Sequence, residues 1–66
     1  MKDLKKRLEV EKAELSEKLG KLRAFISSEK FQEIDDVQMT LLNIQIKAME
    51  TYSQCLLERM VRLDIK

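Results

Sequence analysis

Apolar residues recur every three or four positions along two long stretches of this 66-residue chain, a spacing that predicts two amphipathic α-helices. In the first stretch, about residues 3–26, a helix that turns by about 100° per residue gathers its large apolar residues into a stripe only about 60° wide. The stripe consists of Leu4, Leu8, Leu15, Leu19, Leu22 and Ile26. Charged residues cover the rest of this helix. We therefore expect it to contact one neighbour along a coiled-coil-like seam.

The second stretch, about residues 36–64, has a much broader apolar face, which spans about 220° of the helix. Its members are Leu41, Leu42, Ile44, Ile46, Ala48, Met49, Tyr52, Cys55, Leu56, Leu57, Met60 and Leu63. Thr40, Lys47, Gln54 and Glu58 hold the polar side. One partner helix cannot cover so wide a face. We therefore expect the chain to self-associate as a dimer or a larger assembly.

A short break separates the two helical patterns. Ser27 and Ser28 interrupt the first pattern, and residues 28–34 are typical of a short helical turn. Asp35 with Gln38 three residues later forms a capping box, which predicts the start of the second helix. The sequence has no proline and one glycine, which argues against strands and their turns. We predict an all-α fold: a single domain over residues 1–66, an antiparallel helical hairpin that assembles into a symmetric oligomer.

The composition narrows the function further. Thirteen basic residues against twelve acidic ones leave a net charge of +1, which disfavours binding to a nucleic-acid polymer but leaves room for a local anion pocket. The chain has no histidine and one cysteine, so neither a zinc site nor a nucleophile with a histidine base is expected. No glycine-rich phosphate loop or other catalytic constellation is present either. We therefore expect no enzymatic activity, no metal and no cofactor.

The distribution of apolar residues also bears on location. The first seven residues, Met1 to Arg7, lead into further charged residues and do not resemble a signal peptide. No apolar run approaches the roughly 20 residues that a membrane span requires. We expect a soluble cytoplasmic protein without membrane contact. Cys55 is then interpreted as a small buried apolar residue in a reducing compartment.

One charged residue projects into the apolar face of the second helix. Arg59 lies on the same line as Leu41, and a polar group left unpaired in an interior costs about 1–3 kcal/mol or more. Arg59 could form an ion pair with Glu11 or Glu58, or be exposed near the end of the bundle. Alternatively, it faces a ligand cavity between subunits, where a guanidinium can bind a phosphate or a base edge.

Four further positions have two interpretations each. Gly20 within a helix costs about 1 kcal/mol relative to alanine, which is either tolerated or allows close approach of a neighbouring backbone or a ligand. Tyr52 is either a core aromatic residue or a ring on which a base stacks. Lys18 and Lys21, with Arg23, are either a solvated basic face or an anion site where subunits converge.

The combined spacing of these residues resembles a family of small bacteriophage proteins, the anti-CBASS cyclic-oligonucleotide sponges, whose helical-hairpin domain is shared with anti-Thoeris sponges. The matching residues are Glu11, Glu14, Leu15, Lys18, Leu19, Lys21, Leu22, Phe25, Ile26, Phe31, Leu41, Leu42, Gln45, Ala48, Met49, Tyr52, Leu56 and Arg59. They cover nearly the whole chain, and the short anti-CBASS type is the nearer of the two.

The resemblance implies a specific function. Such proteins form symmetric oligomers, typically hexamers, in the host bacterial cytoplasm, bind cyclic di- or trinucleotides of bacterial immunity between subunits and release them intact. It matches Lys18 to a ligand-contacting lysine and Arg59 to an arginine at the trinucleotide site. Gly20 stands near a position where the family can place a small hydroxyl residue. Lys18, Gly20, Lys21, Tyr52 and Arg59 are therefore the expected cyclic-nucleotide contacts.

Another class of function remains open at this point. A structural or adaptor coiled-coil protein, whose only ligand is another helix, would show the same periodicity. A third class, an accessory protein for single-stranded nucleic acid, is disfavoured by the charge balance and by the absence of tryptophan.

Overall fold

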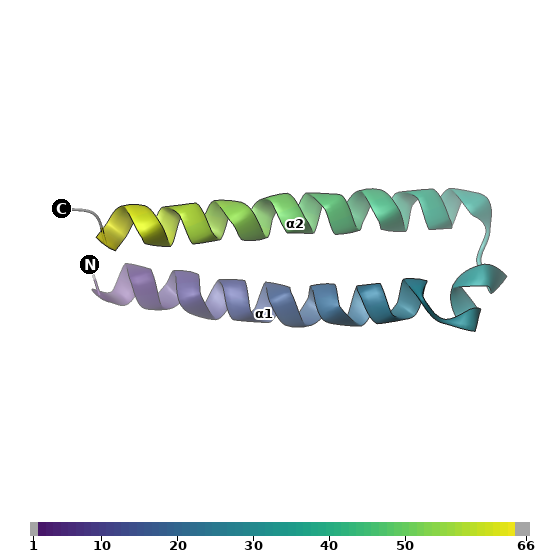
Figure 1. The fold of residues 1–66 in the computed structure, drawn as a ribbon, viewed down its shortest axis with the longest axis horizontal. Helices are drawn as coiled ribbons and strands as arrows, with labels where there is room; N and C mark the ends of the chain where they lie inside the picture. Colours follow the sequence, from purple (N-terminus) through teal and green to yellow (C-terminus); the bar gives the residue numbers. More distant parts are fainter. Residues whose placement is uncertain (1, 65–66) are drawn as a thin grey trace.

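The computed structural model describes residues 2–64, and these form an antiparallel helical hairpin (Figure 1). Helix α1 (Lys2–Ile26) and helix α2 (Asp36–Asp64) lie side by side, joined by the short 3-10 helix η1 (Glu29–Glu33). The Cα atoms extend over 50 × 15 × 13 Å. The start of α1 and the end of α2 lie at the same end of this rod. The predicted all-α hairpin with a short helical turn is confirmed.

The core is a single seam between the two helices. Leu8, Leu15 and Leu19 of α1 and Ile46 and Leu56 of α2 are buried, with partly buried residues of the same two faces packed around them. The buried side of α1 is therefore the narrow stripe that the sequence predicts. On α2 the buried or half-buried positions other than Glu50 recur in strict heptad spacing: Met39, Leu42, Ile46, Met49, Ser53, Leu56, Met60 and Leu63.

The hairpin leaves much of the apolar surface of α2 uncovered. Leu41 is 53% exposed, Ile44 58% and Tyr52 43%, and Val37, Leu57 and Val61 are also exposed. Cys55 is a free, exposed thiol, so the expected burial of Cys55 does not occur within one copy of the chain. The physical reason is geometric, because α1 covers one side of α2 and these residues lie beyond its reach.

The connection between the helices is defined by local hydrogen bonds. At the end of α1, the Ser28 hydroxyl donates to the carbonyl oxygen of Phe25 at 2.6 Å. At the start of α2, Asp35 Oδ1 accepts a hydrogen bond from the backbone N–H of Gln38 at 2.8 Å, which is the predicted N-cap. The rings of Phe25 and Phe31 pack edge to face, with centroids 6.1 Å apart. These contacts position the reversal of the chain.

Two ion pairs between the helices mark their register. Lys5 Nζ lies 2.8 Å from Asp64 Oδ1 at the open end, and Arg23 Nη2 lies 2.6 Å from Glu50 Oε2 nearer the turn. Because both helices rise by the same distance per residue, the levels between these ties can be interpolated. Lys18 then lies within a turn of the level of Tyr52.

Candidate functional site

The hairpin places four of the five expected ligand residues on one face. On α1, Lys18 lies about 70° and Lys21 about 130° from the centre of the buried stripe. On α2, Tyr52 lies about 80° and Arg59 about 100° from the centre of the buried seam. All four are rotated in the same sense when each helix is viewed from its N-terminus. In two antiparallel helices, equal rotational sense corresponds to the same face of the pair. Lys18, Lys21, Tyr52 and Arg59, which we call the basic–aromatic face, are all exposed.

Gly20 does not belong to this face. It lies about 130° from the buried stripe in the opposite sense, which places it toward the other side of α1. A Cβ atom built on Gly20 would have no atom within 4 Å, so no neighbouring backbone approaches it within the described residues. A close approach at Gly20 would therefore have to come from another molecule.

The cations of the basic–aromatic face have few partners. Among residues 2–64, Lys18 and Arg59 form no ion pair within 4.0 Å. Lys21 Nζ lies 3.4 Å from Glu17 Oε1, and both side chains are largely exposed, so solvent screens this pair.

The two carboxylates suggested as partners of Arg59 are not used in that way. Glu58 Oε1 accepts a hydrogen bond from Gln54 Nε2 at 2.9 Å, within the same helix. Glu11 lies at about the level of Arg59 but forms no ion pair with it. In a single copy of the chain Arg59 is therefore exposed, which is one of the interpretations drawn from the sequence. For Arg59 to face a ligand cavity between subunits, a second copy of the chain would have to be present.

Tyr52 is not a core residue in the hairpin, since 43% of its surface is accessible to solvent. Its neighbours along the same side of α2 include Ala48 and Cys55, both exposed. An aromatic ring flanked by small side chains on an open surface can accept a flat apolar group against it. The geometry therefore permits stacking, although one copy provides only one side of such a contact.

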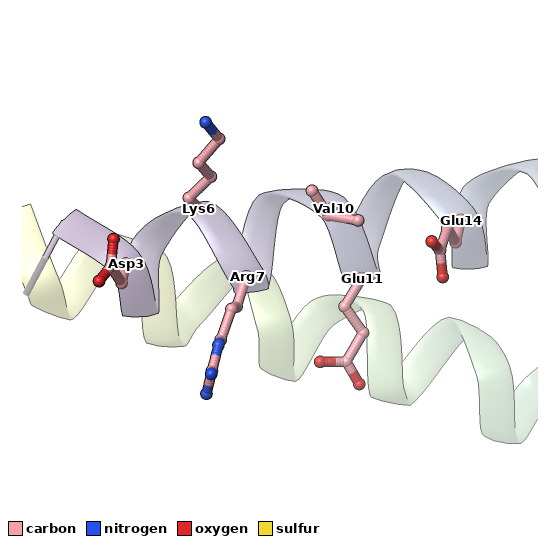
Figure 2. Close-up of a pocket in the computed structure, with 6 residues that line it drawn as sticks. All are labelled: Asp3, Lys6, Arg7, Val10, Glu11 and Glu14. Carbon is pink, nitrogen blue, oxygen red and sulfur yellow. The ribbon is translucent and has the colours of Figure 1, made fainter.

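The surface of the described residues includes three open hollows. The first hollow has a volume of about 430 Å³ and lies along α1 alone. Arg7 and Glu11 point to one side of α1 there, and Lys6 points to the other (Figure 2). This hollow is lined by Asp3, Lys6, Arg7, Val10, Glu11 and Glu14. The second, of about 780 Å³, lies between the helices near the turn; it is lined by Arg23, Ile26, Ser27, Thr40, Asn43, Ile44, Ile46, Lys47 and Glu50. The third, of about 260 Å³, adjoins it; it is lined by Lys12, Ser16, Leu19, Arg23, Glu50, Ser53, Gln54 and Leu57. None of the five expected ligand residues lines any of the three.

Comparison with protein-family models decides the family. The model of the Sequestin family matches residues 2–62, a segment that includes α1, α2 up to Arg62 and the whole basic–aromatic face. The chain belongs to the Sequestin family. Sequestin is the name of the phage anti-CBASS cyclic-nucleotide sponge family, so the family predicted from the residue pattern is confirmed. No curated protein and no solved structure shows a significant match. Membership is consistent with a sequestering anti-defence protein.

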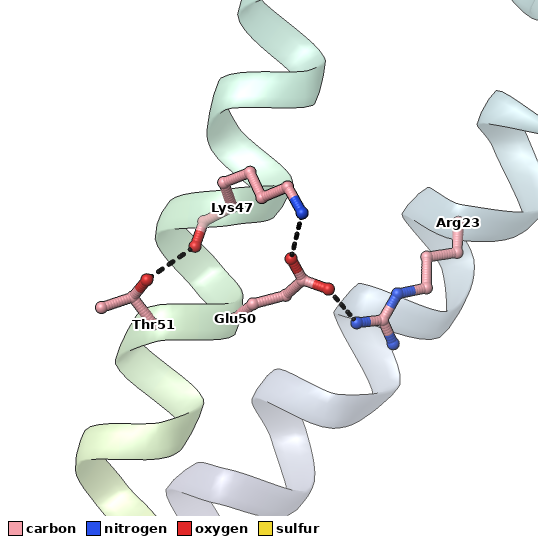
Figure 3. A network of polar contacts seen from close by, with 4 residues as sticks. All are labelled: Arg23, Lys47, Glu50 and Thr51. Atoms are coloured by element: carbon pink, nitrogen blue, oxygen red, sulfur yellow. Dashed lines mark hydrogen bonds and ion pairs between the residues drawn. The ribbon is translucent and has the colours of Figure 1, made fainter.

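Sequence reasoning missed one polar cluster of this Sequestin-family hairpin, which borders the 780 Å³ hollow (Figure 3). Arg23 Nη2 donates to Glu50 Oε2 at 2.6 Å, and Lys47 Nζ lies 3.6 Å from Glu50 Oε1. The hydrogen bond from Arg23 is the largest effect and lowers the pKa of the Glu50 carboxyl. Desolvation comes next and opposes it, and the nearby charge of Lys47 adds a smaller lowering.

This cluster separates Arg23 from the two lysines with which the sequence groups it. Arg23 lies on the opposite face of the hairpin from Lys18 and Lys21, about 80° from the buried stripe in the other sense. One carboxylate between two cations leaves one positive charge uncompensated at the hollow. The spacing of Lys47 and Glu50 along α2 was the available signal, but the pairing with Arg23 depends on the register between helices.

Two further observations concern other classes of site. Within residues 2–64, no three histidine, cysteine or acidic side chains cluster in a way that could hold a metal ion. Over the same residues, neither helix contains a segment apolar and long enough to traverse a bilayer.

Proposed function

We propose that this chain is a phage protein that binds cyclic di- or trinucleotide second messengers of bacterial CBASS immunity in the host cytoplasm and holds them without cleaving them. The observation that carries the proposal is the Sequestin family match over residues 2–62. The exposed basic–aromatic face supports it, because cations and an aromatic ring are the groups that recognise phosphates and bases.

The proposed contacts divide by chemistry. Lys18, Lys21 and Arg59 would bind the phosphates or a base edge through charge-assisted hydrogen bonds, which offset the cost of taking phosphate charges out of water. Tyr52 would stack on a base, a contact worth about 1–3 kcal/mol. Gly20 would allow a ligand or a neighbouring subunit to approach α1 closely, because it carries no side chain.

The binding sites would lie between copies of the chain. The proposed contacts line none of the three hollows described above, so none of those hollows of a single copy is the proposed site. The exposed apolar residues of α2 supply the surface for self-association. We propose a symmetric homo-oligomer, a hexamer, in which converging subunits complete each site.

The protein would act by mass action. Sequestration lowers the free messenger only where the sponge is abundant and its dissociation constant lies below the signalling concentration. The Sequestin family match supports binding without hydrolysis. The ligand should therefore be recovered unchanged.

Calorimetric titration of the purified chain with a panel of cyclic di- and trinucleotides tests this proposal. Saturable binding to at least one member is expected, and mass spectrometry of the molecules released after heating should show the intact nucleotide. A linear or cleaved product would exclude the sponge mechanism. Flat traces across the whole panel would favour the adaptor coiled-coil interpretation.

A pair of lysine variants tests the site. Lys18→Gln should weaken binding because it removes a cation from the basic–aromatic face. Lys30→Gln, in η1 and away from that face, removes the same charge and serves as the matched control. Equal losses in both variants would indicate nonspecific attraction by net charge and would remove Lys18 from the site.

A further inference from the structure

An exposed apolar strip runs along α2 on the side that α1 does not cover. We call it the outer strip; it consists of Val37, Leu41, Ile44, Ala48, Tyr52 and Cys55, all of them exposed. An 11-residue repeat relates Leu41 to Tyr52 and Ile44 to Cys55. That repeat averages about 3.67 residues per turn, close to the helix's own period, so the strip runs almost straight. Its length is about 27 Å at the helical rise per residue.

The outer strip lies about 115° around α2 from the seam that contacts α1. A helix with two apolar stripes at such an angle has places for two neighbours, as in a helical bundle. The hairpin supplies one neighbour, and within the described residues its core consists of five buried side chains, of which Leu56 alone is fully buried. A chain of this size is marginal alone, so covering the second stripe adds needed apolar burial.

We propose that the outer strip pairs with the outer strip of a second copy, antiparallel, about a two-fold axis that passes beside Ala48. In this register Ile44 lies opposite Tyr52 of the partner subunit, and Leu41 lies opposite Cys55 of the partner subunit. Ala48 meets its own counterpart, and its small side chain allows the two helices to approach closely. These opposed pairs are apolar, and Val37 at the end of the strip lies opposite Arg59 of the partner subunit. Each pair away from the axis occurs twice, as in any isologous two-fold contact.

Charge decides between antiparallel and parallel pairing. Arg59 continues the outer strip, 11 residues after Ala48. Parallel pairing would place two Arg59 guanidinium groups opposite each other, which like-charge repulsion opposes. Antiparallel pairing instead brings Arg59 toward the start of the partner's α2, where Asp35 and Asp36 stand. The acidic beginning and basic later part of α2 are therefore complementary in the antiparallel arrangement.

The pairing of the outer strips would also shape the ligand site. This effect on the ligand site rests on the proposed function, but the pairing itself does not. The two-fold axis is perpendicular both to the paired α2 helices and to the line that joins them. It therefore keeps the α1 helices of both copies on the same side of the α2 pair. Their basic–aromatic faces then face each other across one trough. Lys18 and Lys21 of both copies form its walls, and Tyr52 of both copies lies at its floor. One symmetric trough would thus replace two incomplete surfaces.

Disulfide trapping without any nucleotide tests the pairing. Ala48→Cys in a Cys55→Ser background should form a covalent dimer on mild oxidation, because opposed Cα atoms across the axis come within the range that a disulfide spans. Leu41→Cys should also trap a dimer, by bonding to native Cys55 of the partner subunit. The unsubstituted chain should remain largely uncrosslinked, since its Cys55 faces leucine.

The outcomes are separable from those of ligand binding. Parallel pairing in register would also place Ala48 opposite its own counterpart, so trapping of Ala48→Cys does not by itself decide the direction. Efficient trapping of the unsubstituted chain through Cys55 would establish parallel pairing and overturn the proposal. Equal trapping of all three, or of none, would also overturn it. As a second measurement, Ile44→Glu should shift the sedimenting species to a smaller mass with helicity retained, while Val61→Glu, exposed elsewhere on α2, should not.

Discussion

Arg23 on α1 and Glu50 on α2 are joined by a hydrogen bond of 2.6 Å between Arg23 Nη2 and Glu50 Oε2, and this bond ties the two helices together near the turn. Lys47 adds a second, longer contact to the same carboxylate, at 3.6 Å. The pair lies on the opposite face from Lys18 and Tyr52. It can therefore be altered to test the fold without touching the proposed ligand contacts.

The pH dependence of stability should contain a contribution from Glu50. Its folded-state pKa lies below the ordinary value of 4.5, chiefly because of the hydrogen bond from Arg23. A lowered folded pKa means stability that is present above the unfolded pKa and is lost as the pH falls through the folded value. Denaturant unfolding should show the chain more stable than Glu50→Gln at pH 7, and the difference should shrink below pH 4.5. A difference independent of pH would contradict this role.

The core prediction compares two adjacent leucines of α2. Leu56 is 0% exposed, whereas Leu57 is 40% exposed. Leu56→Ala should lower the free energy of unfolding by about 2–5 kcal/mol, because it removes buried methyl groups and leaves a cavity. Leu57→Ala removes the same atoms and should cost much less. Unfolding must be followed at one fixed protein concentration, since self-association would make stability concentration-dependent. Similar losses in the two variants would indicate that Leu57 is also covered.

The sequence predicted the elements whose causes are local. The leucine stripe of α1 follows from periodicity, and the Asp35 cap follows from a side chain that reaches the N–H group three residues later. The Arg23–Glu50 bond could not be predicted in the same way, because it depends on how far one helix slides along the other. Glu11 and Arg59 are the opposite example. The sequence allowed an ion pair between them, but the described residues do not form it.

The candidate site was predictable only in part. The periodicity marked Arg59 as a charge within an apolar face, and it showed that α2 has more apolar surface than one helix covers. It could not show that Lys18 and Tyr52 share a face while Gly20 does not, since that depends on the antiparallel packing of α1 against α2. The enclosure of a ligand depends on contacts between copies, which no pattern within one helix specifies.

The cap of α2 should contribute measurably to stability. Asp35 Oδ1 accepts the Gln38 backbone N–H at 2.8 Å, which satisfies one of the free donors at the helix start. Asp35→Ala should cost about 0.5–2 kcal/mol of unfolding free energy, because that donor loses its partner. Asp35→Asn retains an acceptor oxygen and should keep most of the stability. Circular dichroism during thermal unfolding would measure both, and equal losses would indicate that charge and not the cap is responsible.

Gly20 provides a test in which stability and binding should move in opposite directions. A Cβ atom at this position meets nothing within 4 Å in the hairpin, so Gly20→Ala should stabilise the helix. The gain should be about 1 kcal/mol, which corresponds to a rise of about 4–8 °C in the melting temperature of a domain of this size. If a ligand or a neighbouring subunit approaches here, the same substitution should weaken nucleotide binding. A lower melting temperature would show that Gly20 is already in contact with another copy.

Arg59 offers the sharpest test of the proposed ligand contacts. It forms no ion pair among the described residues, so its removal breaks no internal partnership within the hairpin. Arg59→Ala should weaken binding of a cyclic trinucleotide by about tenfold to a hundredfold, the loss expected for about 1.5–3 kcal/mol of charge-assisted hydrogen bonding.

Two controls separate contact from bulk charge in that experiment. Arg59→Lys keeps the charge but loses the planar fork, so a lysine that fails to restore affinity would indicate bidentate recognition. Arg62→Ala removes the same charge one turn further along α2 and should bind nearly as well as the unsubstituted chain. Sedimentation should show the same oligomer for all three variants, because Arg59 lies at the end of the outer strip and not at its centre. Unchanged trinucleotide affinity in Arg59→Ala would remove this residue from the site, and a collapsed oligomer would reassign it to the contact between copies.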